Sequence, residues 1–209
     1  GPSVWTSSTT STNYPLSAMS SLSSGGYTAS VSSRIDVSYD GWYAFNNVIG
    51  LEGWIGAGQD YNASPNGGYT GSVSTTYNGS TTVDGEWIQL QVPTSITITS
   101  IKIAPVDGNS LYCAGDGIIL GSTNGSTWTL IHSFTGQTYT DGQYTTISFS
   151  NSVAYSYFRL VVERTASNST LYPSIRIGEL KFNKAVVDTY YSGNVGIGTS
   201  SPAYKLDVN

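Results

Sequence analysis

The sequence predicts an all-β protein built as a β-sandwich or jelly roll of about eight antiparallel strands. Only 10% of the 209 residues are charged, whereas 12% are aromatic and 24 residues are glycine. Helical bundles need Ala, Glu, Lys and Leu in quantity, and disordered chains lack aromatic residues, so the composition excludes both classes. Asp-Gly and Asn-Gly pairs recur through the middle of the chain, with short runs of alternating apolar and polar residues between them. Both features are typical of strands joined by tight turns.

The clearest predicted strand covers residues 86–92, in which Ile88, Leu90 and Val92 share one face. Ile96 and Ile98 share one phase and Ile101 and Ile103 the opposite one, which predicts a bulge or bend near Thr99-Ser100. The first strand is expected from about residue 27, and a short turn of helix near Tyr43–Asn47. Further strands are predicted at about 117–121, 127–134, 143–149, 155–163 and 174–183.

Three regions differ in composition. Residues 1–26 are expected to comprise a protease-cleavage scar, Gly1-Pro2, and a Ser/Thr-rich linker. Residues 27–184 carry nearly all strand signals and are expected to form the folded domain, whereas residues 185–209 change character again. Within the domain, residues 50–82 lack a strand signal, and a connection of this length in a compact domain indicates a functional loop.

Charge, cysteine and histidine content exclude several functions. The net charge of −5 and the absence of a basic stripe argue against nucleic acid as a partner. No run of about 20 apolar residues is present, so insertion into a membrane is not expected. With one cysteine, Cys113, no intrachain disulfide can form. One histidine, His132, with no acid–nucleophile pattern around it supports neither a catalytic triad nor a catalytic metal cluster, so the protein is not expected to be an enzyme.

An ordered series of segments resembles the discoidin domain, also called the F5/8 type C or galactose-binding-like domain. The segments are Ala44-Phe45-Asn46-Asn47, Gly53-Trp54, 85–93, 120–130, Tyr157-Phe158-Arg159-Leu160 and Ile177-Gly178-Glu179-Leu180. This family includes carbohydrate-binding modules. The resemblance covers roughly residues 27–184 and implies a β-sandwich jelly roll with ligands bound by loops at one end. It also implies that Trp87 packs in the structure.

The C-terminal segment resembles a connector of phage and virus tail fibres. The similarity lies in Gly193-Asn194-Val195-Gly196-Ile197-Gly198-Thr199, Ser201-Pro202 and Lys205-Leu206-Asp207-Val208. Such fibres are usually trimeric, so the resemblance implies a fragment of a homotrimeric fibre on a virion surface, in an extracellular setting.

Sugar binding requires an aromatic ring for the apolar face of a pyranose and polar side chains for its hydroxyl groups. The irregular stretches supply both, and the candidate residues are Trp54, Tyr61, Tyr69, Tyr112, Arg164 and Tyr172. Trp54 also resembles a tryptophan that packs in the family, and Trp128, which follows a hairpin turn, is expected to pack against the strands. An ordinary surface ion is the alternative for Arg164. Tyr61 and Tyr69 lie among Gly, Pro and Asn without alternation and are the leading candidates for stacking on a sugar.

A structural Ca²⁺ is implied by the same resemblance, held between the loop after residues 44–47 and a glutamate near the last strand. The corresponding residues are Asn46, where the family often has Asp, and Glu179. A neutral ligand in place of a charged one weakens a calcium site.

The predicted function is therefore non-catalytic attachment to cell-surface glycans by a module of a viral or phage fibre. One alternative is a structural spacer domain without a ligand. The other is a targeting module of a larger carbohydrate-active enzyme or adhesin, in which case the tail motif is coincidental.

Overall fold

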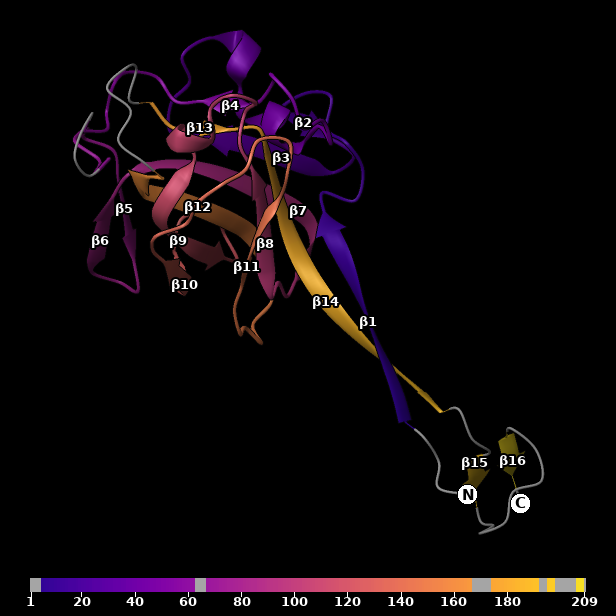
Figure 1. Cartoon of the computed structure of the whole chain (residues 1–209). Coiled ribbons are helices and arrows are strands. Elements are labelled where there is room, and N and C mark those ends of the chain that lie inside the picture. The colour runs from indigo at the N-terminus through magenta and orange to yellow at the C-terminus, as the bar shows by residue number, and fades with distance from the viewer. Residues whose placement is uncertain (1–4, 63–66, 167–173, 192–194, 198–205, 209) are drawn as a thin grey trace. The chain divides into compact units, whose positions relative to one another are not determined.

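A computed structural model describes residues 5–62, 67–166, 174–191, 195–197 and 206–208 (Figure 1). The chain divides into two units, one formed by residues 13–184 and the other by residues 1–12 together with 185–209. The larger unit includes residues assigned to a linker in the sequence analysis. The reason is that Met19 is buried and its backbone N–H donates to Phe45 O at 2.9 Å, so this stretch is part of the fold.

The larger unit contains a six-stranded antiparallel sheet with the order β10-β9-β12-β7-β3-β2. Its strands are β2 (Ser23–Ser24), β3 (Tyr27–Val31), β7 (Glu86–Ile96), β9 (Ala114–Ser122), β10 (Thr129–Phe134) and β12 (Tyr155–Thr165). Strand β12 lies in the middle, where Leu160 pairs with Ile88 of β7 on one side and with Ile119 of β9 on the other. All three side chains are fully buried, so each of these central strands contributes to the core.

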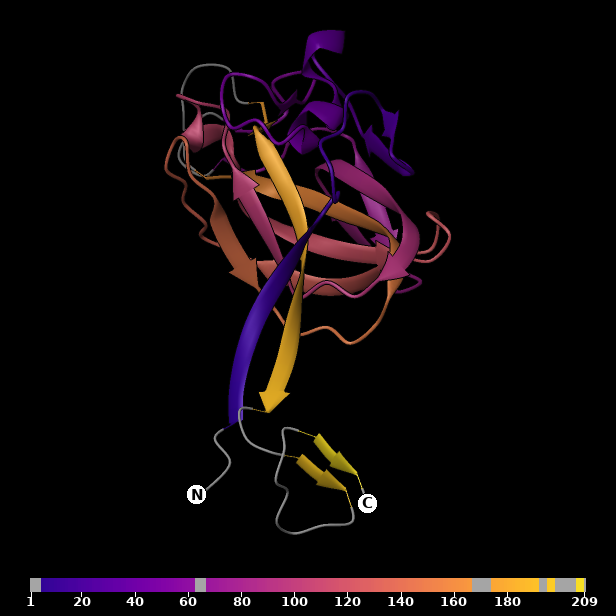
Figure 2. The ribbon, with the colours of Figure 1, turned by 90° about the vertical axis from the view of Figure 1, so that its right-hand side faces the viewer.

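The second sheet has four strands in the order β1-β14-β8-β11. Its strands are β1 (Trp5–Tyr14), β8 (Ser100–Ala104), β11 (Thr145–Ser148) and β14 (Glu179–Tyr191). Strand β14 pairs with β8 so that Leu180 lies opposite Ile103 and Phe182 opposite Ile101. Figure 2 shows β8 and the first part of β14 crossing in front of the strands of the six-stranded sheet.

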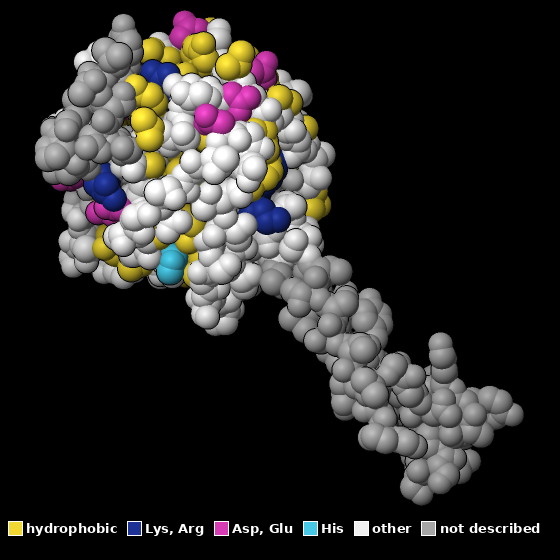
Figure 3. All heavy atoms as spheres, in the orientation of Figure 1, with side chains coloured by type: hydrophobic (Ala, Val, Ile, Leu, Met, Phe, Trp, Pro, Cys, Tyr) yellow, Lys and Arg dark blue, Asp and Glu magenta, His cyan; other side chains and the backbone are white. Residues whose placement is uncertain are grey.

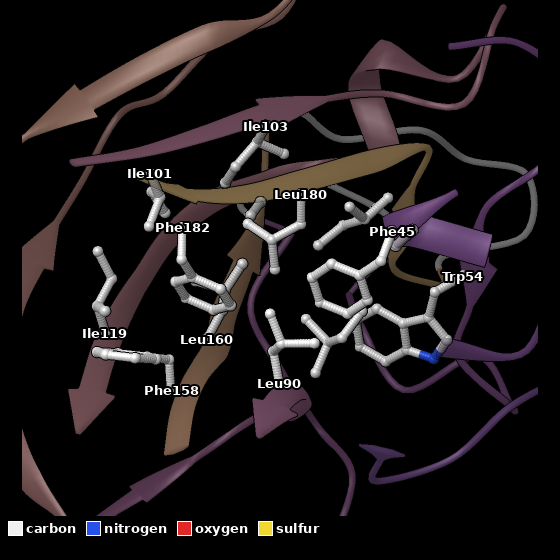
Figure 4. Close-up of a cluster of buried hydrophobic side chains, with 14 of the residues drawn as sticks. Phe45, Trp54, Leu90, Ile101, Ile103, Ile119, Phe158, Leu160, Leu180 and Phe182 are labelled. Carbon is white, nitrogen blue, oxygen red and sulfur yellow. The ribbon is translucent and has the colours of Figure 1, made fainter. Parts of the chain in front are cut away.

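The core lies between the two sheets, which confirms the predicted β-sandwich. Ile119, Phe158 and Leu160 enter it from the six-stranded sheet, and Ile101, Leu180 and Phe182 from the other (Figure 4). The 3-10 helix η2 (Gly41–Phe45) adds Phe45 at one end, close to the predicted helical turn. On β7, Ile88, Leu90 and Val92 are buried while the residues between them are partly exposed, as the alternation predicted.

One local prediction is confirmed and another is wrong. Residues 97–99 connect the two sheets, because β7 belongs to the six-stranded sheet and β8 to the four-stranded one, so a bend of the chain and not a bulge changes the phase of the isoleucines. The stretch 50–82 contains strand β4 (Trp54–Ile55), which pairs with β13 (Arg176–Ile177), and the start of a hairpin of β5 (Ser74–Tyr77) and β6 (Thr81–Asp84). Asn78 and Gly79 turn this hairpin with positive φ values of 48° and 83°.

A smaller apolar cluster packs on β9, β10 and β12. It includes the buried Trp128 and the partly buried Trp87, and the guanidinium of Arg159 lies over both indole rings, 3.8 Å from the Trp87 centroid and 4.2 Å from the Trp128 centroid. Both tryptophans therefore pack within the structure, which confirms the sequence interpretation of these two residues.

In the smaller unit, β15 (Val195–Ile197) pairs in parallel with β16 (Leu206–Val208). The remaining residues of the proposed connector motif lie outside the described residues. No helix among the described parts of the chain has the length and apolar character needed to cross a membrane.

Candidate functional site

Three segments that are distant in sequence meet around the C-terminal end of β12. Tyr69 N donates to Glu163 O at 2.9 Å, and Thr165 N donates to Gly67 O at 3.0 Å, which joins β12 to the segment before β5. Ala166 N donates to Cys113 O at 2.7 Å, which joins it to the segment before β9. The structure thus brings the loops of Tyr69, Tyr112 and Arg164 together, which sequence reasoning could not show. Tyr172 lies outside the described residues.

Trp54 and Tyr61 lie in the core, with exposed fractions of 0% and 2%. Trp54 Nε1 donates to Ser33 O at 2.8 Å. The Tyr61 hydroxyl donates to Val162 O at 2.9 Å and accepts from Glu86 N at 3.3 Å, and burial raises the pKa of this hydroxyl. The expectation that these rings stack on a sugar is wrong, because neither ring has an accessible face.

Tyr69 supports the loop that contains it. Its ring packs edge-on against Tyr61, with 5.2 Å between the centroids, and its hydroxyl accepts a hydrogen bond from Val73 N at 3.0 Å. The ring is partly buried in the core cluster. These contacts give Tyr69 a structural role in closing residues 69–73.

Arg164 forms a two-pronged ion pair with Asp116. Arg164 Nε donates to Asp116 Oδ2 at 2.6 Å and Arg164 NH2 donates to Oδ1 at 2.7 Å, while Gly136 N also donates to Oδ1. The hydrogen bonds from Arg164 hold the pKa of Asp116 below its usual range, and the pKa of Arg164 is raised in turn. With 30% and 23% of the two side chains exposed, the pair borders the surface at the meeting point of the loops.

Tyr112 is part of a second polar cluster nearby, which we call the Tyr112 cluster and define as Asp107, Asn109, Tyr112 and Arg176. Tyr112 ends the 3-10 helix η3 (Ser110–Tyr112), and the guanidinium of Arg176 lies 4.6 Å from its ring centroid. Arg176 NH1 donates to Asn109 Oδ1 at 2.6 Å, and Asn109 Nδ2 donates to Asp107 O at 2.8 Å. Arg176 holds this cluster together from β13.

The hydrogen bonding of the Tyr112 cluster is incomplete. Asp107 Oδ1 and Arg176 Nε are buried and have no hydrogen-bond partner. Since nearly all buried polar atoms in proteins are paired, an unpaired acceptor and an unpaired donor in one cluster require an explanation. Both atoms lie below the surface of the free protein, so a hydroxyl-rich ligand could pair with them only after neighbouring side chains move aside.

Sequence reasoning selected Tyr112 and missed Arg176, Asn109 and Asp107. A signal for Arg176 was present in Ile175-Arg176-Ile177, where both isoleucines are fully buried and the arginine between them must point the other way. Its position shortly after Tyr172 would have placed it with the candidate aromatic residues.

The oxygens expected to hold calcium are already engaged. Glu179 Oε2 lies 2.8 Å from the Lys181 ammonium, which also contacts Asn47 Oδ1, and Glu179 Oε1 accepts from Val48 N at 3.2 Å. Asn46 bonds elsewhere, since its Nδ2 donates to Glu52 Oε2 at 3.0 Å and its Oδ1 accepts from Val48 N at 2.8 Å. Burial raises the pKa of Glu179, and Lys181 opposes this shift. This donor set, with a cation of its own, does not fit Ca²⁺.

The other reactive side chains have structural surroundings. Cys113 is fully buried, and burial raises the pKa of its thiol to about 12, so it is not a nucleophile at neutral pH. The ring of His132 stacks on Phe149 with 5.2 Å between the centroids. Among the residues that the structure describes, no group of three or more His, Cys, Asp or Glu side chains could hold a metal ion.

Comparison with protein families identifies the fold and its relatives. A family model described as the F5/8 type C domain matches residues 52–175, more than half of the chain. The chain belongs to this family. No curated protein matches it.

Solved structures of this family share the fold. A family 32 carbohydrate-binding module of NanJ from Clostridium perfringens, solved in complex with galactose, is 14% identical with a TM-score of 0.55, and the match covers 84% of this chain and 100% of that chain. A module from a family 31 glycoside hydrolase of the same organism is 17% identical with a TM-score of 0.53, covering 75% and 90%. An F5/8 type C domain from Bacteroides fragilis is 13% identical with a TM-score of 0.55, covering 76% and 91%. At these identities the likeness shows a shared fold.

A Tyr61→Phe substitution tests the structural role of this tyrosine. Removing the hydroxyl leaves Val162 O and Glu86 N without their partner inside the core. We expect the free energy of unfolding to fall by about 1–3 kcal/mol, measured by urea denaturation. A variant as stable as the wild type would contradict this assignment.

The Arg164–Asp116 pair predicts a pH dependence. Since the pKa of Asp116 is lowered in the folded state, the pair stabilises the fold above the unfolded pKa of about 3.9 and loses that contribution as the pH falls through the folded pKa. Asp116→Asn should therefore cost about 1 kcal/mol at neutral pH. The difference from the wild type should shrink steadily in urea titrations below about pH 4. A difference that stays constant with pH would show that the charge of Asp116 is not its cause.

Proposed function

We propose that the domain is a non-catalytic module that binds a neutral glycan at the Tyr112 cluster. The observation that carries this proposal is the position of the partly buried Tyr112 ring beside Arg176 and Asn109, together with the unpaired Asp107 Oδ1 and Arg176 Nε. An aromatic ring next to planar polar groups suits a pyranose, whose C–H face is apolar and whose rim carries hydroxyl groups. Family membership supports the same ligand class.

Each side chain has a distinct part in this proposal. The ring of Tyr112 contacts the sugar ring, Arg176 donates to hydroxyl oxygens, and Asp107 and Asn109 accept from hydroxyl protons. The Arg164–Asp116 pair lies on the segments that adjoin the cluster, so it borders an extended glycan beyond the first sugar. A site with one aromatic contact and a few hydrogen bonds supports dissociation constants of roughly millimolar to micromolar.

A neutral ligand agrees with the surface. In the view of Figure 3, the Lys and Arg side chains and the Asp and Glu side chains form small separate spots on a face of mostly uncharged atoms. A ligand with several charges would meet no matching patch on this face. The module of NanJ was solved with galactose, which makes galactose and oligosaccharides ending in it the first probes.

The wider setting proposed here is a fibre that attaches a virus or phage to a cell. The support is the Gly-Asn-Val-Gly-Ile-Gly-Thr sequence at 193–199 and the parallel pairing of β15 with β16. In that setting the module is extracellular on a virion, and three copies would bind one surface. Weak sites joined in this way gain avidity, because later binding events become intramolecular.

Glycan binding is tested with the full chain on a glycan array, followed by calorimetry with galactose. We expect Tyr112→Ala and Arg176→Ala to weaken binding at least tenfold, which corresponds to about 1.4 kcal/mol. Tyr112→Phe should bind nearly as well as the wild type because the ring is kept.

Lys102→Ala, on β8 of the four-stranded sheet, is the control for loss of a positive charge. Circular dichroism establishes that each variant is folded. Binding unchanged in folded Tyr112→Ala and Arg176→Ala would contradict the site, and no binding of any glycan by the folded wild type would contradict the function and favour a spacer.

The trimer is tested by sedimentation equilibrium of the full chain. We expect a mass three times the 22.1 kDa of one chain. A monomer over the whole measurable concentration range would contradict the proposed trimer without affecting the glycan site, whose residues all come from one chain.

A further inference from the structure

A buried ion pair joins the last strand of the sandwich to the loop after η2. Glu179 and Lys181 both belong to β14, two residues apart on one face, and their side chains are 0% and 7% exposed. The ammonium lies 2.8 Å from Glu179 Oε2 and also donates to Asn47 Oδ1. Tyr144 adds a long contact, with its hydroxyl 3.4 Å from the same carboxylate oxygen.

The backbone of the loop is shaped around this pair. Asn47 has a positive φ of 63°, a conformation that Asn adopts more readily than most residues, and from there its side-chain oxygen reaches the ammonium. Val48 N donates to Glu179 Oε1 at 3.2 Å, so the second carboxylate oxygen binds the loop directly. One carboxylate and one ammonium thus connect loop and strand.

The charges at this position balance without an added ion. A buried carboxylate is strongly unfavourable unless a positive charge and hydrogen bonds compensate it, and the ammonium supplies one positive charge and up to three donors. Ca²⁺ needs six to eight oxygen ligands at about 2.3–2.6 Å. Here the ammonium has taken the carboxylate oxygen and the amide oxygen that would begin such a shell. A divalent ion would also be repelled by Lys181.

We propose that the Lys181 ammonium is a built-in cation that takes the place of the calcium ion implied by the resemblance to this family. The loop that follows Asn46 is then held to β14 by a side chain of the protein, and the domain keeps its stability when divalent cations are removed. This inference concerns the fold and stands or fails independently of glycan binding.

The first test needs no variant. Thermal unfolding of the wild-type chain is followed in EGTA and in millimolar CaCl₂, and metal bound to the purified protein is measured by elemental mass spectrometry. We expect the same Tm in both buffers and no stoichiometric calcium. A Tm that rises with calcium, or one calcium per chain, would overturn the proposal.

The second test removes the ammonium in two ways. Lys181→Met keeps most of the side-chain volume and should lower the Tm by roughly 10 °C, since it leaves a buried carboxylate without its partner. Lys181→Ser should lower the Tm similarly, and calcium should restore part of the loss because the shorter residue frees the position and adds an oxygen. Calcium should restore nothing in Lys181→Met, where the methyl end fills the space.

Lys102→Ser is the matched control, because Lys102 lies directly opposite Lys181 on β8 and is partly exposed. Its Tm should change by no more than about 2 °C and should not respond to calcium. A Lys181→Met variant as stable as the control, or a Lys181→Ser variant that calcium leaves unchanged, would overturn the role of the ammonium as a replacement cation.

If Lys181→Ser and Lys181→Met fail to fold, Asn47→Gly tests the contact between the ammonium and the loop. Glycine keeps the positive φ and removes the side chain whose oxygen the ammonium contacts. A Tm that falls by a few degrees and does not change when calcium is added supports the proposal. A Tm equal to that of the wild type would show that Asn47 does not hold the cation and would overturn it.

Discussion

The close packing of backbone around the C-terminal end of β12 is the constraint on which the site depends. Three glycines from two segments approach this end so closely that a Cβ would collide with its backbone: Gly85, Gly115 and Gly117. At Gly85 and Gly117 the collision would be with the carbonyl oxygens of Val162 and Val161, which belong to the sheet and cannot move aside. A side chain at either position would separate β12 from its neighbours. Glycine is required there for proximity, because neither residue has a positive φ.

This packing decides which side chains can meet at the loop end. With β12 held between β7 and β9, Arg164 lies opposite Asp116 in the strand register, and the two-pronged ion pair follows from that pairing. The next residues of β12 bond to the segments of Gly67 and Cys113, which orders the loops on either side. The position at which β12 ends in the sheet therefore decides which loops come together around the candidate site.

Alternation and composition were sufficient to predict the sandwich. In a strand that is buried on one face, every second side chain points into the core, as those of Ile88 and Leu90 do. Dipeptide signals were less informative. Asp84-Gly85 and Asp116-Gly117 have the sequence of a turn, yet both glycines lie against β12, and nothing local distinguishes close approach from a turn. Tyr61 was misassigned for a related reason. Its neighbours are typical of a loop, but the loop folds inward and its hydroxyl pairs with core backbone, a contact across 101 residues that no local pattern records. Tyr112 and Arg164 were selected because they lie in or beside irregular stretches; in the structure Tyr112 ends η3 and Arg164 lies one residue before the end of β12.

The polar cluster around Glu179 and the Tyr112 cluster differ in how completely their polar atoms are paired. Around Glu179 each charge has a counterpart, since the carboxylate meets Lys181 and Val48 N, and no acceptor or donor is left over. Such a cluster holds elements together and has nothing to offer a ligand. Around Tyr112 the hydrogen bonding is incomplete. Arg176 Nε and Asp107 Oδ1 are buried without partners, although Asn109 bonds to both residues. An unpaired buried group costs about 1–3 kcal/mol. In the proposed glycan site, a hydroxyl-rich ligand would recover that cost once the side chains around the two atoms move to admit it. In the proposed arrangement Lys181 completes the Glu179 cluster, whereas a glycan would complete the Tyr112 cluster.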